Sequence, residues 1–176
     1  GQHRGGYTGF AVEITDLVDR EGENLLTVQL DTREDPAIPP FGFVIDYLTY
    51  GGIYRAVSLD IKEPAYLRDV FVEARSEGDF RIYTATVGET VGCTLQAEIR
   101  SPAGSRAVYS GELSLPITGT LNNVHPWSLE HPTLYTLTVQ LIRPGTGGLP
   151  DRVLDEKTVR FGFRTVQFVA GGLDLN

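Results

Sequence analysis

The sequence has no methionine, a single cysteine and no long apolar run, and each absence excludes something. Because Cys93 stands alone, the 176 residues cannot form an internal disulfide framework or a cysteine-rich metal site. No apolar run approaches the roughly 20 residues that a membrane-spanning helix needs. A chain without methionine cannot begin at its own initiator, so we expect a processed product or a fragment of a longer protein.

Positive charge is also scarce. The chain has 15 Lys and Arg against 23 Asp and Glu, which gives a net charge of -8 and a pI near 4.8. Nucleic acids and anionic membranes are bound by clustered Lys and Arg, so this composition argues against both as partners. A neutral ligand is compatible with it.

No segment shows a sustained helical period, and apolar residues instead alternate with polar ones as in half-buried strands. In the first third of the chain this alternation predicts strands at residues 10–14, 26–30 and 57–61. Residues 15–24 carry Asp and Gly turn formers and predict at most one helical turn. Three prolines within residues 31–42 predict a long irregular loop.

The alternation becomes more regular after Arg68. Strands are predicted around Val70, Ile82 and Ala97, across residues 108–115, around Val139, and in a last run that ends at Phe168 after the turn "RPGTGGLPD". Roughly seven strands within about 100 residues are typical of an immunoglobulin-like sandwich. The sequence therefore predicts an all-β chain, with a domain boundary near residues 66–68.

Catalytic and metal-binding motifs are absent from the sequence. His3, His125 and His131 are too scattered for a ligand set, and His125, beside a proline, is interpreted as a loop residue. The chain lacks G-x-S-x-G, H-E-x-x-H and the phosphate-binding glycine patterns. Glycosidase chemistry requires two carboxyl groups that face each other across a pocket, and the sequence identifies no such pair among its Asp and Glu residues. We expect no catalytic residue, no metal and no cofactor in this chain.

Four longer segments nevertheless form a recognisable series. They are "GQHRGGYTGFAVEITDLV" with "GENLLTVQLD", then "DYLTYGGIYRAVSLDI", "PWSLEHPTLYTLTVQL", and "GFRTVQF" with "GGLDLN". In this order and spacing they resemble the family 2 glycoside hydrolases, which include β-galactosidases, β-glucuronidases and β-mannosidases. The resemblance covers the chain from Gly1 to Asn176.

The resemblance implies a domain order. Enzymes of this family begin with a jelly-roll sugar-binding domain, continue into an immunoglobulin-like sandwich and then enter a (β/α)8 barrel that holds two catalytic glutamates. Residues 1–67 resemble the later part of the jelly roll, residues 68–170 the sandwich, and residues 171–176 the start of the connection to the barrel. A barrel of about 250 residues does not fit in this chain, so the catalytic glutamates are expected beyond Asn176 and the chain alone is not expected to be catalytic.

A partial jelly roll has a physical consequence. Such a domain uses about eight strands in two sheets, and residues 1–67 supply only the later ones. We therefore expect this segment to expose strand edges and apolar faces, and to be less ordered or to form intermolecular contacts.

Asp46, in the stretch "FVIDYLTYGGIYRAV", is the one predicted substrate-binding residue. The resemblance implies that this aspartate lies on a jelly-roll loop at the mouth of the barrel and contacts hydroxyls of the sugar. An ionised carboxylate suits that role because its charge-assisted hydrogen bonds are strong. The alternative is that Asp46 only caps the following turn. Tyr47 and Tyr50 are expected to line the same mouth or to pack in the core, with core packing favoured for at least one of them.

Three other residues receive structural interpretations. Trp127 is expected to pack as a core aromatic at the edge of the sandwich. Arg55 and Arg164, each within a strand-like pattern, are expected to form ion pairs or hydrogen bonds.

The resemblance implies that the chain is a non-catalytic N-terminal region of a retaining, β-galactosidase-like family 2 β-glycosidase, which braces the barrel and shapes the sugar-binding entrance. The alternative is a free-standing carbohydrate-binding or immunoglobulin-like interaction module. Expected partners are the β-glycoside and the barrel of the same polypeptide, together with a homo-oligomer as one option. The sequence leaves the compartment open among bacterial cytoplasm, periplasm and secretion, and does not distinguish which β-glycoside is cleaved.

Overall fold

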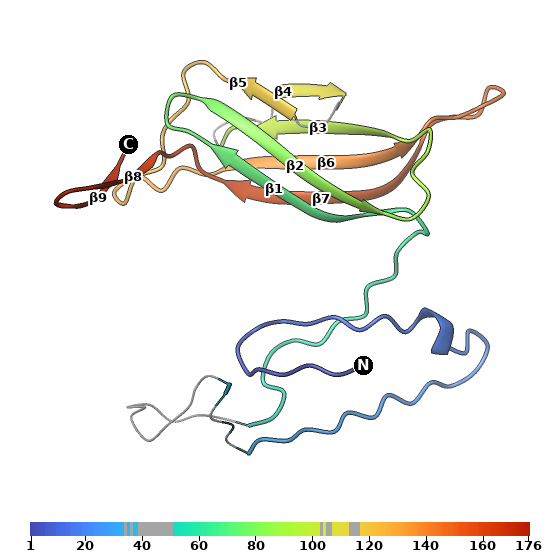
Figure 1. Ribbon diagram of the computed structural model, residues 1–176. Coiled ribbons are helices and arrows are strands. Elements are labelled where there is room, and N and C mark those ends of the chain that lie inside the picture. The colour runs from blue at the N-terminus through green and yellow to red at the C-terminus, as the bar shows by residue number, and fades with distance from the viewer. Residues whose placement is uncertain (34, 36, 39–50, 103, 105–106, 113–116) are drawn as a thin grey trace. The chain divides into compact units, whose positions relative to one another are not determined.

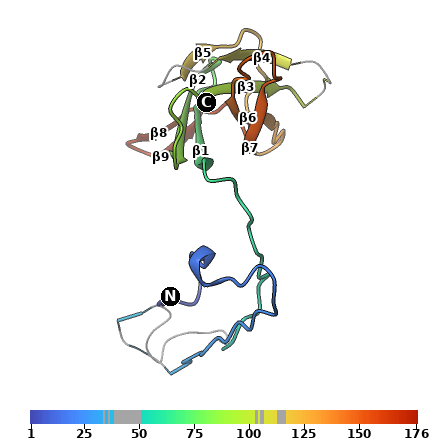
Figure 2. The same cartoon turned by 90° about the vertical axis from the view of Figure 1, so that its right-hand side faces the viewer.

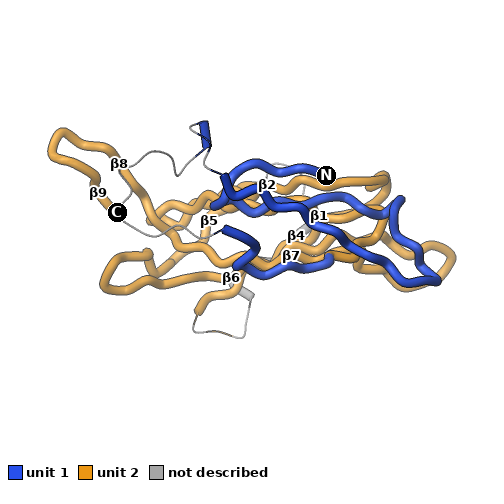
Figure 3. The backbone as a smooth tube through the Cα atoms, turned by 90° about the horizontal axis from the view of Figure 1, so that it is seen from below, with its two compact units in different colours: residues 1–59 blue, residues 60–176 orange. Residues whose placement is uncertain are grey.

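The computed structural model describes the chain except residues 34, 36, 39–50, 103, 105–106 and 113–116, and describes residues 107–112 by their backbone. The chain divides into two compact units, Gly1–Leu59 and Asp60–Asn176, which Figure 3 shows in different colours.

The described residues of the first unit form little regular structure. Among its described residues the only regular element is the 3-10 helix η1, Thr15–Leu17, which agrees with the single helical turn predicted there. The turn that follows is held by Asp19, whose carboxylate accepts hydrogen bonds from the backbone N–H groups of Glu21 and Gly22.

The strands predicted at residues 10–14, 26–30 and 57–61 do not form. A strand is stable only when a neighbour completes its hydrogen-bond ladder, and the described residues of this unit offer no such ladder. Their apolar side chains are correspondingly exposed, by 63% for Phe10 and by 70% for both Leu26 and Val57. The predicted exposure of apolar faces is confirmed, while the predicted intermolecular contacts stay a prediction.

The second unit contains a seven-stranded sandwich made of two antiparallel sheets (Figures 1 and 2). One sheet has the order β1-β2-β5 and consists of Tyr66–Ala74, Asp79–Val87 and Ile117–Thr120. The other has the order β4-β3-β6-β7 and consists of Ala107–Glu112, Thr94–Arg100, Tyr135–Arg143 and Arg152–Phe161. A separate hairpin, β8 (Val166–Val169) with β9 (Gly172–Leu175), follows the sandwich.

These strands confirm the all-β prediction, with two differences. The run predicted at residues 108–115 corresponds to β4, and the next strand, β5, was not predicted because only one of its four residues, Ile117, is buried. The last predicted run is two strands, since β7 ends at Phe161 and β8 begins at Val166.

The core lies between the two sheets and is formed by the inward side of each strand. In β6, Tyr135, Leu137, Val139 and Leu141 are at most 3% exposed, and the residues between them are partly exposed. This is the alternation that a strand with one buried face produces. The core is completed by Ala65, Leu67, Val70, Phe80, Ile82, Ala97, Ile99, Ile117, Leu154, Phe161 and Phe163.

Strands β1 and β7, from different sheets, run side by side in the same direction (Figure 1). Near their starts, the backbone N–H of Leu67 donates to the Asp155 carboxylate. Near their ends, the N–H of Arg164 donates to the carbonyl of Ala74. The chain therefore enters the sandwich at one end and leaves it at the other.

Asp155 ties the first residues of the sandwich to β7. Its side chain is 10% exposed, and it accepts hydrogen bonds from the Leu67 N–H at 2.9 Å and from Lys62 Nζ at 3.1 Å. Burial, the largest single influence, raises the pKa of Asp155, but the hydrogen bonds and the charge of Lys62 together outweigh it and leave the pKa below the ordinary 3.8.

The folded state should therefore depend on the charge of Asp155. A carboxyl group whose pKa is lowered by folding stabilises the protein above its unfolded pKa, and this stabilisation is lost as the pH falls through the folded value. We expect Asp155→Asn to lower the free energy of unfolding by about 1–2 kcal/mol at pH 7, and the difference from the wild type to shrink below about pH 4. Urea unfolding between pH 7 and pH 2 measures both effects.

The matched control is Asp60→Asn, because Asp60 is an exposed aspartate of the same unit. An equal loss of stability in the two variants, or a loss in Asp155→Asn that does not change with pH, would contradict the role given to Asp155.

Candidate functional site

The predicted sugar-contacting residue, Asp46, lies outside the described residues, as do Tyr47 and Tyr50. The end of the same stretch is described. Gly52 has a φ of +95°, a backbone conformation that favours glycine. The guanidinium of Arg55 lies 5.5 Å from the centre of the Tyr54 ring. The contact recorded for Arg55 is thus a cation–π contact, where an ion pair or hydrogen bond was expected.

The best-defined cluster of polar contacts lies where the chain leaves the sandwich. We call it the junction and define it by Ser76, Trp127, Arg164, Thr165 and Asn176. These residues come from the β1–β2 turn, the loop before β6, the segment after β7 and the position just after β9.

Trp127 forms one side of the junction. Its backbone N–H donates to the Phe163 carbonyl at 2.8 Å, and the guanidinium of Arg164 lies 5.5 Å from the centre of its ring. A Cβ atom on Gly162 would lie 2.7 Å from the Cβ of Trp127, so glycine allows this close approach. Trp127 is half-buried and lies outside the buried core of the sandwich, so its contacts are with Gly162, Phe163 and Arg164 at the edge and it is not the core aromatic that was expected. Arg164, like Arg55, contacts an aromatic ring where an ion pair or hydrogen bond was expected.

Asn176 joins three segments through its backbone and side chain. Its Oδ1 accepts from the Thr165 N–H at 3.0 Å, its own N–H donates to the Thr165 carbonyl at 2.8 Å, and its Nδ2 donates to the Trp127 carbonyl at 2.8 Å. Its φ of +71° is a left-handed conformation that asparagine tolerates better than most residues. The end of the β8–β9 hairpin is therefore fixed to the sandwich.

Ser76 and Thr165 extend the same attachment to the β1–β2 turn. The Ser76 N–H donates to Thr165 Oγ1 at 3.1 Å, and the two hydroxyl oxygens are 2.7 Å apart. Because the hairpin and the β1–β2 turn share Thr165, the junction links both to one end of the sandwich.

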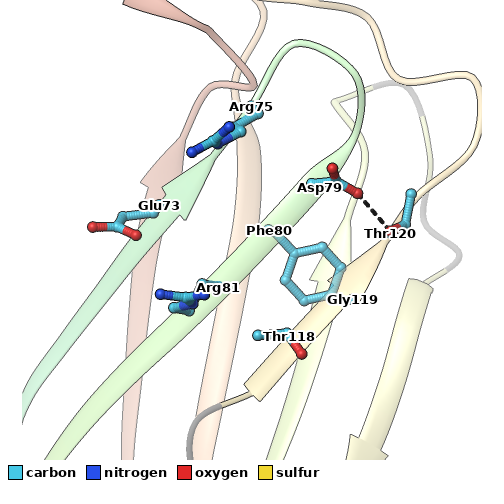
Figure 4. Close-up of a pocket in the computed structure, with 8 residues that line it drawn as sticks. All are labelled: Glu73, Arg75, Asp79, Phe80, Arg81, Thr118, Gly119 and Thr120. Carbon is cyan, nitrogen blue, oxygen red and sulfur yellow. Dashed lines mark hydrogen bonds between the residues drawn. The ribbon is translucent and has the colours of Figure 1, made fainter.

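A shallow hollow of about 400 Å³ lies over strands β1, β2 and β5 (Figure 4). Its lining carries charges of both signs from Glu73, Arg75, Asp79 and Arg81. Several of its polar groups already have partners: Thr120 Oγ1 donates to Asp79, and the hydroxyl of Tyr83 accepts from Arg81 and donates to Glu73. We interpret the hollow as a solvated sheet face rather than as a catalytic site.

The histidines show no metal-binding arrangement in the described part of the chain. His3 stacks on Phe10, with ring centres 4.4 Å apart, and His125 lies in the loop before β6, as predicted. No group of three or more His, Cys, Asp or Glu side chains among the described residues is placed to hold a metal ion. These residues also contain no helix with the length and apolar character to cross a membrane.

Comparison with protein families gives a match to the model described as "Glycosyl hydrolases family 2" over residues 65–164. Curated relatives include the β-galactosidase of Thermoanaerobacter pseudethanolicus, 33% identical over 96% of this chain and 23% of the relative. The β-galactosidase of Rhizobium meliloti is 36% identical over 82% of this chain and 20% of the relative. The chain thus spans about a quarter or less of the length of these relatives.

Solved structures with a similar fold include the FMN-binding β-glucuronidase from Facaelibacterium prausnitzii L2-6. Its TM-score is 0.65 at 21% identity, over 82% of this chain and 23% of that one. A β-glycosidase from Bacteroides vulgatus gives a TM-score of 0.59 at 22% identity, over 71% of this chain and 17% of that one. At these identities the likeness supports the fold alone.

Proposed function

The chain belongs to glycosyl hydrolase family 2, and on that basis we propose that it is a non-catalytic part of a longer, retaining β-galactosidase-like β-glycosidase. The observation that carries the proposal is the position of the family match. It spans residues 65–164, which are the residues of the sandwich from the start of β1 to just beyond β7.

The share of the relatives that the chain covers supports the same proposal. Three of the curated relatives are β-galactosidases of which the chain spans only 20–26%. Within such a protein we assign residues 1–67 to the jelly roll, 68–170 to the sandwich and 171–176 to the connection with the barrel. The two catalytic glutamates belong to the barrel, beyond Asn176.

We assign two tasks to this region of the enzyme. The sandwich braces the barrel, and the junction supports this task because Asn176 and Thr165 hold the outgoing chain with short hydrogen bonds. The jelly-roll segment shapes the sugar-binding entrance through Asp46, whose carboxylate accepts hydrogen bonds from two hydroxyls of the β-glycoside.

Asp46→Ala in the full-length enzyme tests the second task. A hydrogen bond to a charged group contributes about 1.5–3 kcal/mol, so the variant should lower kcat/KM for the preferred β-glycoside by about one to two orders of magnitude. Steady-state kinetics on a chromogenic β-galactoside and on β-glucuronide and β-mannoside analogues measure the loss.

Asp16→Ala is the matched control, because Asp16 is an exposed aspartate of the same unit in η1. Its kinetics should equal those of the wild type. Unchanged kinetics for a folded Asp46→Ala enzyme would leave Asp46 only its role in the turn.

A further inference from the structure

One face of the β8–β9 hairpin is formed by apolar side chains, and the other face is more polar. In its register Val166 pairs with Leu175 and Phe168 with Leu173, so these four side chains lie on the same face. The opposite face carries Gln167, paired with Asp174, and Val169, paired with Gly172. The hairpin is thus amphipathic, like a strand pair that packs against a core.

No core covers this apolar face in the described structure. Phe168 is 90% exposed, Leu173 59% and Val166 46%, and the sandwich core contains no residue of either strand. A two-stranded hairpin is marginally stable by itself in water, and it becomes stable when an apolar face packs against another element. The sequence of the hairpin therefore suits a position in which another element packs against its apolar face.

The base of the hairpin is held in a fixed direction. Thr165, just before β8, and Asn176, just after β9, exchange two hydrogen bonds, and Asn176 also donates to the Trp127 carbonyl. Because the strands begin and end at these residues, the junction sets the orientation in which the sandwich presents the apolar face.

We propose that the apolar face of the β8–β9 hairpin is a docking surface for the domain that follows Asn176 in the same polypeptide. The inference rests on the proposed function, in which that domain is the barrel. Four partly exposed side chains offer roughly a few hundred Å² of apolar area, well below the ~800 Å² per partner of a stable interface between separate chains. A covalently connected domain is present at high effective concentration, so a small surface suffices.

The test measures the accessibility of position 168 in the full-length protein. Phe168→Cys is treated with a maleimide reagent, and labelling at this position is followed by peptide mass mapping. Leu149→Cys is the matched control, because Leu149 is 72% exposed in the turn between β6 and β7, at the other end of the sandwich (Figure 1). A docked hairpin should make labelling at position 168 at least tenfold slower than at position 149.

Equal labelling rates at the two positions would overturn the proposal. Protection that disappears on dilution would also overturn it, because a second copy of the chain would then be the occupant. Hydroxyl-radical footprinting of Phe168 and Leu149 in the unsubstituted protein gives the same comparison if Phe168→Cys does not fold. Neither measurement uses catalytic activity, so a failure here is distinguishable from a failure of the proposed function, which the Asp46→Ala kinetics report.

Discussion

Replacing Phe163 with alanine is expected to lower the free energy of unfolding of the sandwich by about 3–5 kcal/mol. Phe163 is fully buried, and its ring contacts Tyr135 edge-on with centres 4.9 Å apart and Phe161 with centres 5.3 Å apart. The substitution removes apolar burial and also leaves a cavity, because the two neighbouring rings can close the space only in part. Denaturant unfolding of the chain measures the loss.

The control is Phe71→Ala, which removes the same side chain from a surface position. Phe71 is 57% exposed on β1, where its ring lies 6.2 Å from that of Tyr83. We expect a loss of no more than about 1 kcal/mol, mostly from the aromatic pair. If Phe163→Ala unfolded at the same denaturant concentration as Phe71→Ala, the stabilising role given to Phe163 in the core would be wrong.

Replacing Gly88 with alanine is expected to lower the free energy of unfolding of the sandwich by about 2–4 kcal/mol. Gly88 follows β2 with a φ of +85°, which costs an alanine about 1 kcal/mol. A Cβ atom there would also lie 1.8 Å from the carbonyl oxygen of Pro64. Since this is a backbone atom, either the β2–β3 connection or the segment entering β1 must move, which adds about 1–3 kcal/mol.

Gly92→Ala separates these two causes. Gly92 lies in the same connection with a φ of +75°, but a Cβ atom there meets nothing within 4 Å. Only the conformational cost of about 1 kcal/mol is expected. Thermal or denaturant unfolding of both variants measures the difference, and equal losses would show that the contact with Pro64 is not the cause.

The sandwich could be predicted from the sequence because the apolar and polar residues that alternate along its strands are buried and exposed in turn. In β6 the predicted inward residues Leu137 and Val139 are fully buried, and their neighbours face outward. The short strand β5 was missed because its ladder with β2 is determined by neighbours distant in the sequence, such as the pairing of Thr118 with Arg81. Four residues with a central Gly119 carry too little periodicity to indicate that pairing.

In the first unit, the alternation of apolar and polar residues was not sufficient to predict strands. Residues 10–14 and 26–30 alternate as clearly as β6 does, yet they form no strand. Alternation indicates that a segment suits a half-buried position in a sheet, but it carries no information on whether a partner strand is present. That this unit is the later part of a jelly roll, as the family resemblance implies, stays a prediction.

The candidate site could be predicted only from the family resemblance, and not from the residue pattern itself. Neither composition nor spacing distinguishes Asp46 from the other aspartates, and its contact with sugar stays a prediction. The junction was not predicted, because its hydrogen bonds join residues far apart in sequence, such as Asn176 and Trp127. The motifs "PWSLEHPTLY" and "GFRT" contained Trp127, Arg164 and Thr165, and "GGLDLN" contained Asn176, but no local pattern assigned these residues to each other.

The parallel course of β1 and β7 has a mechanical consequence. A force that pulls the two flanking parts of the polypeptide apart is applied to the start of β1 and the end of β7, along the strand direction. The ladders joining β1 to β2 and β7 to β6 lie across that force, so their bonds are loaded together in shear instead of opening one after another. With β1 nine residues long, the sandwich becomes a spacer of about 30 Å that resists stretching, and flanking parts attached to its ends keep their separation under load.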